Sequence, residues 1–130
     1  MSVPAQAPTG PKDAVGTPFV HPVERELARV FDEHGIEWEY EPHTFVLERH
    51  EDGSVKEAFT PDFYLPQLGI YVECTVMRQA LTNRKRQKAI KARIREGVIV
   101  EILFRRDIER LAHRWKLPRL AAAIRCAPEV

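Results

Sequence analysis

Two carboxylates in the middle of the chain are the residues best placed to do chemistry. Asp62 follows a proline ahead of an extended segment, and Glu73 lies 11 positions later inside the apolar run 70–76. A Glu in a β-branched run is costly to bury unless something pairs with it or binds it. Strand alternation is the alternative, since it would place Tyr71, Glu73 and Thr75 together on a solvated face. The residue types alone leave both interpretations open.

The net charge of +1 conceals a sharp asymmetry along the chain. Residues 20–75 carry 4 Lys/Arg against 13 Asp/Glu, a balance of −9, whereas residues 76–120 carry 14 against 4, a balance of +10. Halves so opposed favour a polyanion-binding face beside a cluster of carboxylates. Mutual neutralisation across the fold explains the same pattern, because charge runs are usually solvated faces.

Other kinds of chemistry find little support in the residue pattern. The two cysteines, Cys74 and Cys126, form neither a disulfide framework nor a zinc site. Ser2 and Ser54 are the only serines and have no partner pattern, and there is no phosphate-binding glycine-rich motif. No apolar run approaches a membrane span, and the N-terminus lacks the order of a secretory signal. We therefore expect a cytoplasmic protein with no membrane partner.

Hydrophobic periodicity predicts a sheet with helices on its faces. Gly35 ends the first helix, Thr82 is an N-cap for the basic helix, and Ile90 and Ile94 mark that helix's apolar side. The predicted elements are a helix over 22–34, strands over 36–40 and 44–47, a hairpin turn at 51–54, an extended segment over 60–66, a strand over 70–76, a helix over 82–96, a strand over 98–104, a helix capped by Asp107, and a final helix after Pro118.

These elements predict an α/β fold with a mixed β-sheet flanked by helices, in the order α-β-β-β-α-β-α. The strand, helix and strand over 70–104 form a βαβ unit with parallel strands. Residues 1–20 hold four prolines and no apolar period, so we expect a flexible leader. The remaining residues, 21–130, are expected to form a single domain with a core over about 21–105 and a helical C-terminal extension.

The order of Pro61-Asp62 and Glu73-Cys74-Thr75 resembles the PD-(D/E)xK nuclease superfamily, in which Pro-Asp precedes a strand and Glu-x-Lys lies on the next one. Many relatives add a helical Glu and a characteristic phrase upstream. The matching residues here are Glu24, Leu27, Gly35-Ile36, Trp38 and Tyr40-Glu41-Pro42. The resemblance covers roughly residues 21–105 and implies a restriction-endonuclease-like fold.

This resemblance implies a Mg²⁺-dependent DNA endonuclease that hydrolyses phosphodiester bonds. Asp62, Glu73 and the backbone carbonyl of Cys74 would hold Mg²⁺, with Mn²⁺ as the alternative ion. Glu24 would hold a metal-bound water or a second ion. An ordinary first-turn carboxylate, favoured by the helix macrodipole, is the alternative for Glu24.

The sequence departs from the family pattern at one position, because Thr75 stands where the lysine is expected. The resemblance implies that the following helix can supply this lysine instead. Lys85 and Lys88 are three residues apart and share a helix face. We expect one of them to be catalytic, with Lys85 favoured because it lies nearer the strand that carries Glu73. Phosphate binding or simple solvation is the alternative for both lysines.

The basic helix is also expected to bind backbone phosphates without distinguishing sequence. The residues concerned are Arg84, Lys85, Arg86, Lys88, Lys91, Arg93 and Arg95. The expected partner is nucleic acid, with DNA favoured, and a homodimer or a partner protein would supply specificity. Two alternatives remain: a catalytically inactive nuclease-fold module that binds nucleic acid, and a protein-interaction domain whose acidic and basic halves dock.

Overall fold

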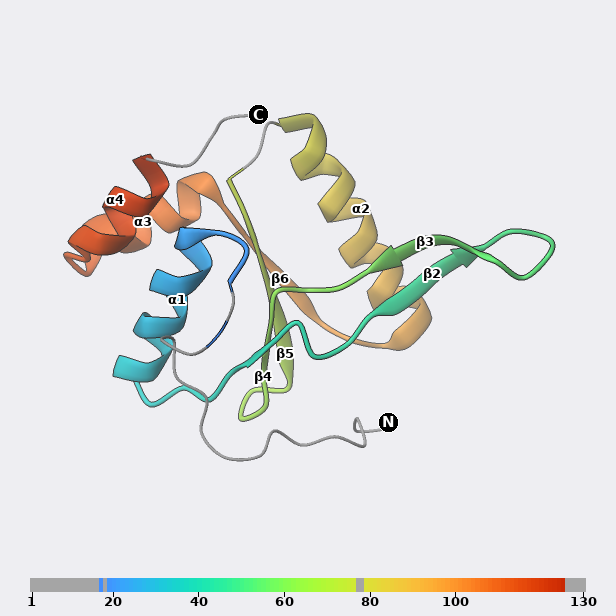
Figure 1. Ribbon diagram of the computed structural model, residues 1–130, viewed down its shortest axis with the longest axis horizontal. Coiled ribbons are helices and arrows are strands. Elements are labelled where there is room, and N and C mark those ends of the chain that lie inside the picture. The colour runs from blue at the N-terminus through green and yellow to red at the C-terminus, as the bar shows by residue number, and fades with distance from the viewer. Residues whose placement is uncertain (1–16, 18, 77–78, 126–130) are drawn as a thin grey trace.

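The computed structural model describes residues 17, 19–76 and 79–125 (Figure 1). Most of the predicted leader, residues 1–20, lies outside this described part, as does Cys126. Phe19 belongs to the packed domain, because its ring contacts those of Trp38, Tyr40 and Phe63 at centroid distances of 5.8, 4.7 and 6.1 Å. The packing thus begins before residue 21, where the domain was expected to start.

A mixed four-stranded sheet forms the centre of the molecule. Its strands, in spatial order, are β1 (Glu39–Tyr40), β4 (Phe63–Leu65), β5 (Ile70–Thr75) and β6 (Val100–Phe104). β4 pairs antiparallel with β1 and with β5, whereas β5 and β6 are parallel. The helix α2 (Gln79–Glu96) connects the parallel pair. The predicted mixed sheet and the predicted parallel βαβ unit are therefore confirmed.

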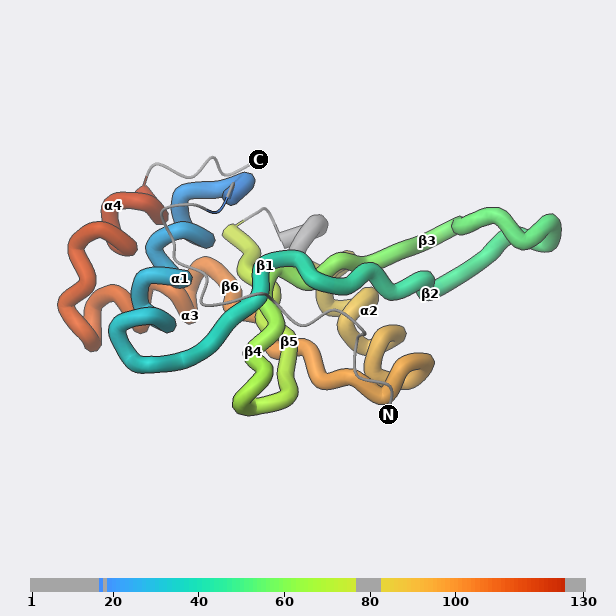
Figure 2. Tube along the Cα trace, turned by 60° about the horizontal axis from the view of Figure 1, so that its bottom comes forward, coloured from blue at the N-terminus to red at the C-terminus, as the bar shows by residue number. Residues whose placement is uncertain are grey.

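The strands β2 (Phe45–Arg49) and β3 (Val55–Phe59) form a separate two-stranded sheet. This hairpin extends away from the body of the molecule beside α2 (Figure 2). Its turn is closed by Asp52, whose Oδ1 accepts a hydrogen bond from the Ser54 backbone N–H at 2.9 Å. Within the described residues, five strands precede α2, where the predicted order has three, and the final helix predicted after Pro118 is present.

Helices cover both faces of the central sheet (Figure 1). On one face lie α1 (Pro22–Glu33), α3 (Arg105–Arg114) and α4 (Pro118–Arg125). They form the larger core with the side chains of Phe63, Leu65, Val72 and Cys74. A smaller core on the other face joins α2 to the hairpin and contains Leu47, Phe59, Ala89 and Ala92. Side-chain alternation along β5 therefore directs Tyr71, Glu73 and Thr75 toward the α2 side.

The structure corrects two details of α2. The helix begins three residues before Thr82, so the predicted N-cap there is wrong. Its inner face is formed by Ala89 and Ala92, while Ile90 and Ile94 are 47% and 77% exposed. Small side chains let the helix backbone approach the hairpin closely, a contact that larger isoleucines would prevent. The predicted apolar side is therefore the solvent side.

Candidate active site

Asp62 and Glu73 meet at the paired ends of β4 and β5. The antiparallel register places Phe63 opposite Val72, so the next positions along each strand become neighbours. The Asp62 backbone N–H donates to Glu73 Oε1 at 2.9 Å, and the Cys74 N–H donates to Asp62 Oδ2 at 2.8 Å. Both carboxylates are buried. The strand pairing itself thus locks the two side chains that the sequence singled out.

Lys85 brings a cation to this carboxylate pair from the first half of α2. Its Nζ lies 2.7 Å from Glu73 Oε2 and donates to the Cys74 carbonyl oxygen at 3.2 Å. The helix reaches this position because it follows directly from the strand that carries Glu73. Thr75, which stands at the family's lysine position, is buried with 2% exposure. Of the two lysines predicted for this role, Lys85 is the one placed at the carboxylates.

The other lysines of α2 also face inward, but toward the hairpin. Lys88 Nζ donates to the carbonyl oxygen of Ala58 at 3.3 Å. Lys91 Nζ lies 2.6 Å from Glu48 Oε1 and 2.8 Å from Glu57 Oε1. The spacing of three between these lysines, together with the alanines beside them, is the sequence signal for this inner stripe.

The predicted phosphate-binding set therefore divides by residue type. The lysines contact carboxylates and carbonyls of the same chain, whereas the arginines are exposed. The exposed members are Arg84, Arg86, Arg93 and Arg95. Arg86 also lies over the Phe104 ring, 4.9 Å from its centroid. These arginines are the part of the set that a polyanion can reach.

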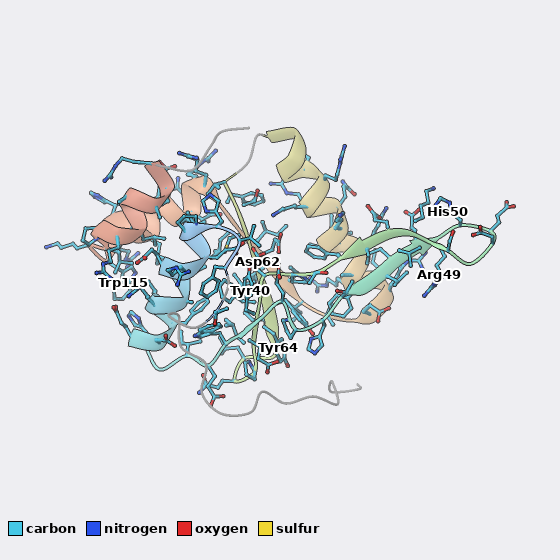
Figure 3. The ribbon with its side chains drawn as sticks, in the orientation of Figure 1. Tyr40, Arg49, His50, Asp62, Tyr64 and Trp115 are labelled. Carbon is cyan, nitrogen blue, oxygen red and sulfur yellow. The ribbon has the colours of Figure 1, made fainter. Side chains whose placement is uncertain are left out.

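Glu24 supplies a third carboxylate from the first turn of α1. The Tyr40 hydroxyl donates to Glu24 Oε1 at 2.6 Å and accepts from the Val20 backbone N–H at 3.2 Å. Figure 3 places Tyr40 and Asp62 in the middle of the molecule, between α1 and α2. Glu24 is buried and its charge acts on Asp62, so it is not a solvated first-turn residue. The sequence did not reveal Tyr40 as its hydrogen-bond partner.

The three carboxylates outnumber the one ammonium group at the site. Burial, followed by the charges of Glu73 and Glu24, raises the pKa of Asp62 to about 9. Burial also raises the pKa of Glu73, against the opposing charge of Lys85. Burial alone would lower the pKa of Lys85, but the ion pair with Glu73 outweighs it and raises that pKa. The site therefore holds more negative charge than its lysine offsets.

The oxygens of this site are suitable ligands for a hard cation. Within the described residues, no group of three or more His, Cys, Asp or Glu side chains is arranged to hold a metal ion. Mg²⁺, however, takes only one or two carboxylates from a protein and completes its shell with waters. Asp62, Glu73 and the Cys74 carbonyl match that donor chemistry, and the raised pKa of Asp62 reflects charge that a divalent ion would neutralise. The residues present fit Mg²⁺. Lys85 Nζ contacts two of the same oxygens, Glu73 Oε2 and the Cys74 carbonyl oxygen.

A second polar cluster on the α2 side of the sheet had no sequence signal. The His43 ring nitrogen Nδ1 and the Tyr71 hydroxyl oxygen lie 2.7 Å apart, and the Tyr64 ring packs beside Tyr71. Burial lowers the pKa of His43 and raises that of Tyr71 to about 12.

Burial likewise raises the pKa of the Cys74 thiol, so this cysteine stays protonated and contributes only its backbone to the carboxylate site.

Comparison of the chain with protein-family models, with curated proteins and with solved structures finds no match. Across the described residues, no helix combines the length and the apolar character needed to span a membrane. The interpretation of the site therefore depends on its own geometry.

Proposed function

We propose that the protein is a metal-dependent phosphodiesterase that cuts DNA at the site formed by Asp62, Glu73 and Lys85. One observation carries the proposal. Lys85 approaches Glu73 from α2 and so stands in for the lysine that the family pattern places at Thr75. A purely structural ion pair would not require the neighbouring Asp62 to be buried and locked as well. Such an arrangement is common where charge must develop and be stabilised.

Each residue has a separate task in the proposed reaction. Asp62, Glu73 and the Cys74 carbonyl would hold Mg²⁺ or Mn²⁺, which when bound lowers the pKa of water and neutralises phosphate charge. Lys85 supplies a fixed positive charge next to Glu73, where it stabilises negative charge on the phosphodiester. Tyr40 fixes the Glu24 carboxylate through its hydroxyl. The exposed arginines of α2 hold the backbone phosphates without distinguishing bases.

Nicking of supercoiled plasmid tests this assignment. The wild type should nick with Mg²⁺ and not with EDTA. Lys85→Met should lower the rate about 100-fold or more, because one preorganised charge is worth roughly that much. The matched variant Lys88→Met removes a lysine of the same helix face and should leave the rate nearly unchanged. Circular dichroism and DNA-binding measurements confirm that each variant folds and binds.

Two further variants sharpen the test. Glu73→Gln keeps the side-chain shape and should abolish nicking, so wild-type activity in this variant would end the assignment. Thr75→Lys in the Lys85→Met background restores a lysine on the same strand face as Glu73 and should recover part of the rate. A folded double variant that nicks no better than Lys85→Met would show that the two positions do not serve one role.

An inactive nucleic-acid-binding module is the second candidate, and one contact favours it. Lys85 Nζ already occupies Glu73 Oε2 and the Cys74 carbonyl oxygen, two of the oxygens expected to bind the ion. A site that uses lysine to neutralise its carboxylates would have no need of a metal. In that case isothermal titration with Mg²⁺ or Mn²⁺ gives no heat of binding, while salt-dependent DNA binding remains.

A further inference from the structure

The turn between α3 and α4 exposes a tryptophan among cations. Trp115 is 56% exposed. The exposed arginines and lysines within five positions of it in the sequence are Arg110 and Arg114 on α3, Lys116 in the turn, and Arg119 in the first turn of α4. We call Trp115 and these four residues the Trp115 corner. In Figure 3 Trp115 lies at the end of the molecule opposite the hairpin, with Asp62 between them.

The backbone and the ring of Trp115 each make a defined contact. Its backbone N–H donates to the Leu111 carbonyl oxygen at 3.0 Å as the helix ends. The ring makes a T-shaped contact with the His34 ring at a centroid distance of 5.7 Å. The His34 ring is itself fixed by a 2.9 Å hydrogen bond between Nδ1 and the Val30 carbonyl oxygen. Trp115 is therefore a preorganised aromatic platform, which reduces the entropy lost on binding.

The surroundings of Trp115 fit a nucleic acid better than a protein. A protein interface places its aromatic residues in an apolar core that is depleted in charged residues. The other large exposed apolar side chains of the described residues are Val20, Val55, Leu68, Ile90, Ile94 and Ile99. None of these lies on α3 or α4. A solitary aromatic face amid cations is instead the arrangement that stacks a base and holds the adjoining phosphates.

Acidic residues near the corner do not cancel its charge. Glu109 on α3 and Asp32 and Glu33 at the end of α1, close to His34 in the sequence, are exposed. Four cations against these three carboxylates leave a net positive charge. Backbone phosphates would therefore be attracted to the corner, and their binding would weaken with salt.

We propose that the Trp115 corner is a second nucleic-acid contact that binds an unpaired base. In a duplex the bases are stacked on each other, so a protein aromatic side chain can stack only on a base at an end, in a loop or in a single strand. The corner therefore selects single-stranded or branched nucleic acid over a blunt duplex. Binding here is independent of chemistry at Asp62 and Glu73, so a chain that does not cut would still bind.

Fluorescence anisotropy with a labelled oligo(dT) strand and a blunt duplex tests the proposal, using the full chain in EDTA. Trp115→Ala should weaken binding of the single strand about 10-fold, since stacking of one base is worth about 1–3 kcal/mol. Trp115→Phe should retain most of the affinity. Leu68→Ala removes an equally exposed apolar side chain elsewhere and should change nothing. The assay contains EDTA and measures binding alone, which separates this test from the test of cleavage.

Tryptophan emission gives a direct second readout. Trp38 is buried, so acrylamide should quench Trp115 selectively, and bound oligo(dT) should protect it. Unchanged quenching in the complex, or unchanged affinity in Trp115→Ala, would overturn the proposal. Binding of polyglutamate that equals oligo(dT) binding and depends on Trp115 would also overturn it, because the corner would then recognise acidic protein.

Discussion

The fold disfavours the ionised form of Asp62. Burial and the neighbouring Glu73 and Glu24 raise its pKa to about 9. In the unfolded chain the same carboxyl group has its ordinary pKa of 3.8. Between these two values the folded protein binds a proton that the unfolded chain releases. Stability without metal should therefore fall as the pH rises through this range.

We predict that urea unfolding in EDTA shows decreasing stability from pH 7 to pH 8.5. The slope for one carboxyl group cannot exceed about 1.4 kcal/mol per pH unit, and the raised pKa of Glu73 acts in the same direction. The raised pKa of Lys85 changes the stability only above the ordinary lysine pKa of 10.5. The lowered pKa of His43 changes it only below the ordinary histidine pKa of 6.5. Asp62→Asn should flatten the profile and stabilise the protein at pH 8.5. Stability that rises with pH in the wild type would contradict this prediction.

The sequence predicted the contact between Asp62 and Glu73, which are close together in the chain. Asp62 and Glu73 meet because a single tight turn at Gly69, with φ of +67°, joins their strands. The choice between Lys85 and Lys88 could not be made with certainty, since both lie on the inner face of α2. The choice depends on where α2 crosses the sheet, and the spacing of residues within one helix does not predict that position.

The C-terminal ends of α1, α2 and α3 share a left-handed backbone conformation, but different residues adopt it. α1 and α2 are followed by Gly35 and Gly97, with φ of +67° and +68°. α3 is followed by Lys116 at φ of +53°, a left-handed conformation that a side chain disfavours. The hydrogen bonds match those of α1, because Leu117 N–H donates to the Ala112 carbonyl oxygen at 2.9 Å. α3 therefore ends in a motif that normally uses glycine.

We predict that Lys116→Gly stabilises the protein by about 0.5–1 kcal/mol. Glycine removes the strain of the left-handed conformation, and part of that gain is lost to the greater entropy of the unfolded chain. Thermal melting measures the effect, and Lys116→Ala is the control that removes the charge but keeps the Cβ. If both variants change the melting temperature equally, the strain at φ of +53° is not the cause.

At the scale of elements, Ile90 and Ile94 misled the prediction because an isoleucine usually marks a buried face. In α2 the buried positions are alanines, and the inner face also accommodates lysine stems whose amino groups reach acceptors. Such stems bury apolar surface while their charged ends remain paired. Trp115 is a further large apolar side chain that is exposed, because its exposure depends on how α3 and α4 meet.

The whole molecule is built around two cores of unequal strength. The larger core holds α1, α3, α4 and one face of the sheet. The smaller core contains Leu47 and Phe59, with Ala89 and Ala92 as its remaining buried members. Alanine buries little apolar area, and hydrophobic stabilisation is roughly proportional to that area. The unit formed by α2 and the hairpin should therefore open at a lower free energy than the rest.

We predict that hydrogen exchange followed by mass spectrometry shows faster exchange in α2 and β2–β3 than in α1 and β4–β5. Leu47→Ala should accelerate the first group strongly, because large-to-small core changes cost about 2–5 kcal/mol, and leave β4–β5 protected. Leu120→Ala, the matched change in the larger core, should accelerate exchange throughout. Equal rates in α1 and α2 of the wild type would show one cooperative unit instead.

The division into two cores has a consequence for heat and for proteolysis. Lys85 belongs to the weaker unit, whereas Asp62 directly precedes β4 and Glu73 lies on β5, both in the stronger one. Warming should withdraw the lysine from the carboxylates before the molecule melts, and cooling should return it. The withdrawn segment is rich in lysine and arginine, which trypsin cleaves, so a brief tryptic digest at moderate temperature would cut first within α2. The completed triad of Asp62, Glu73 and Lys85 thus reports that both halves of the protein are folded.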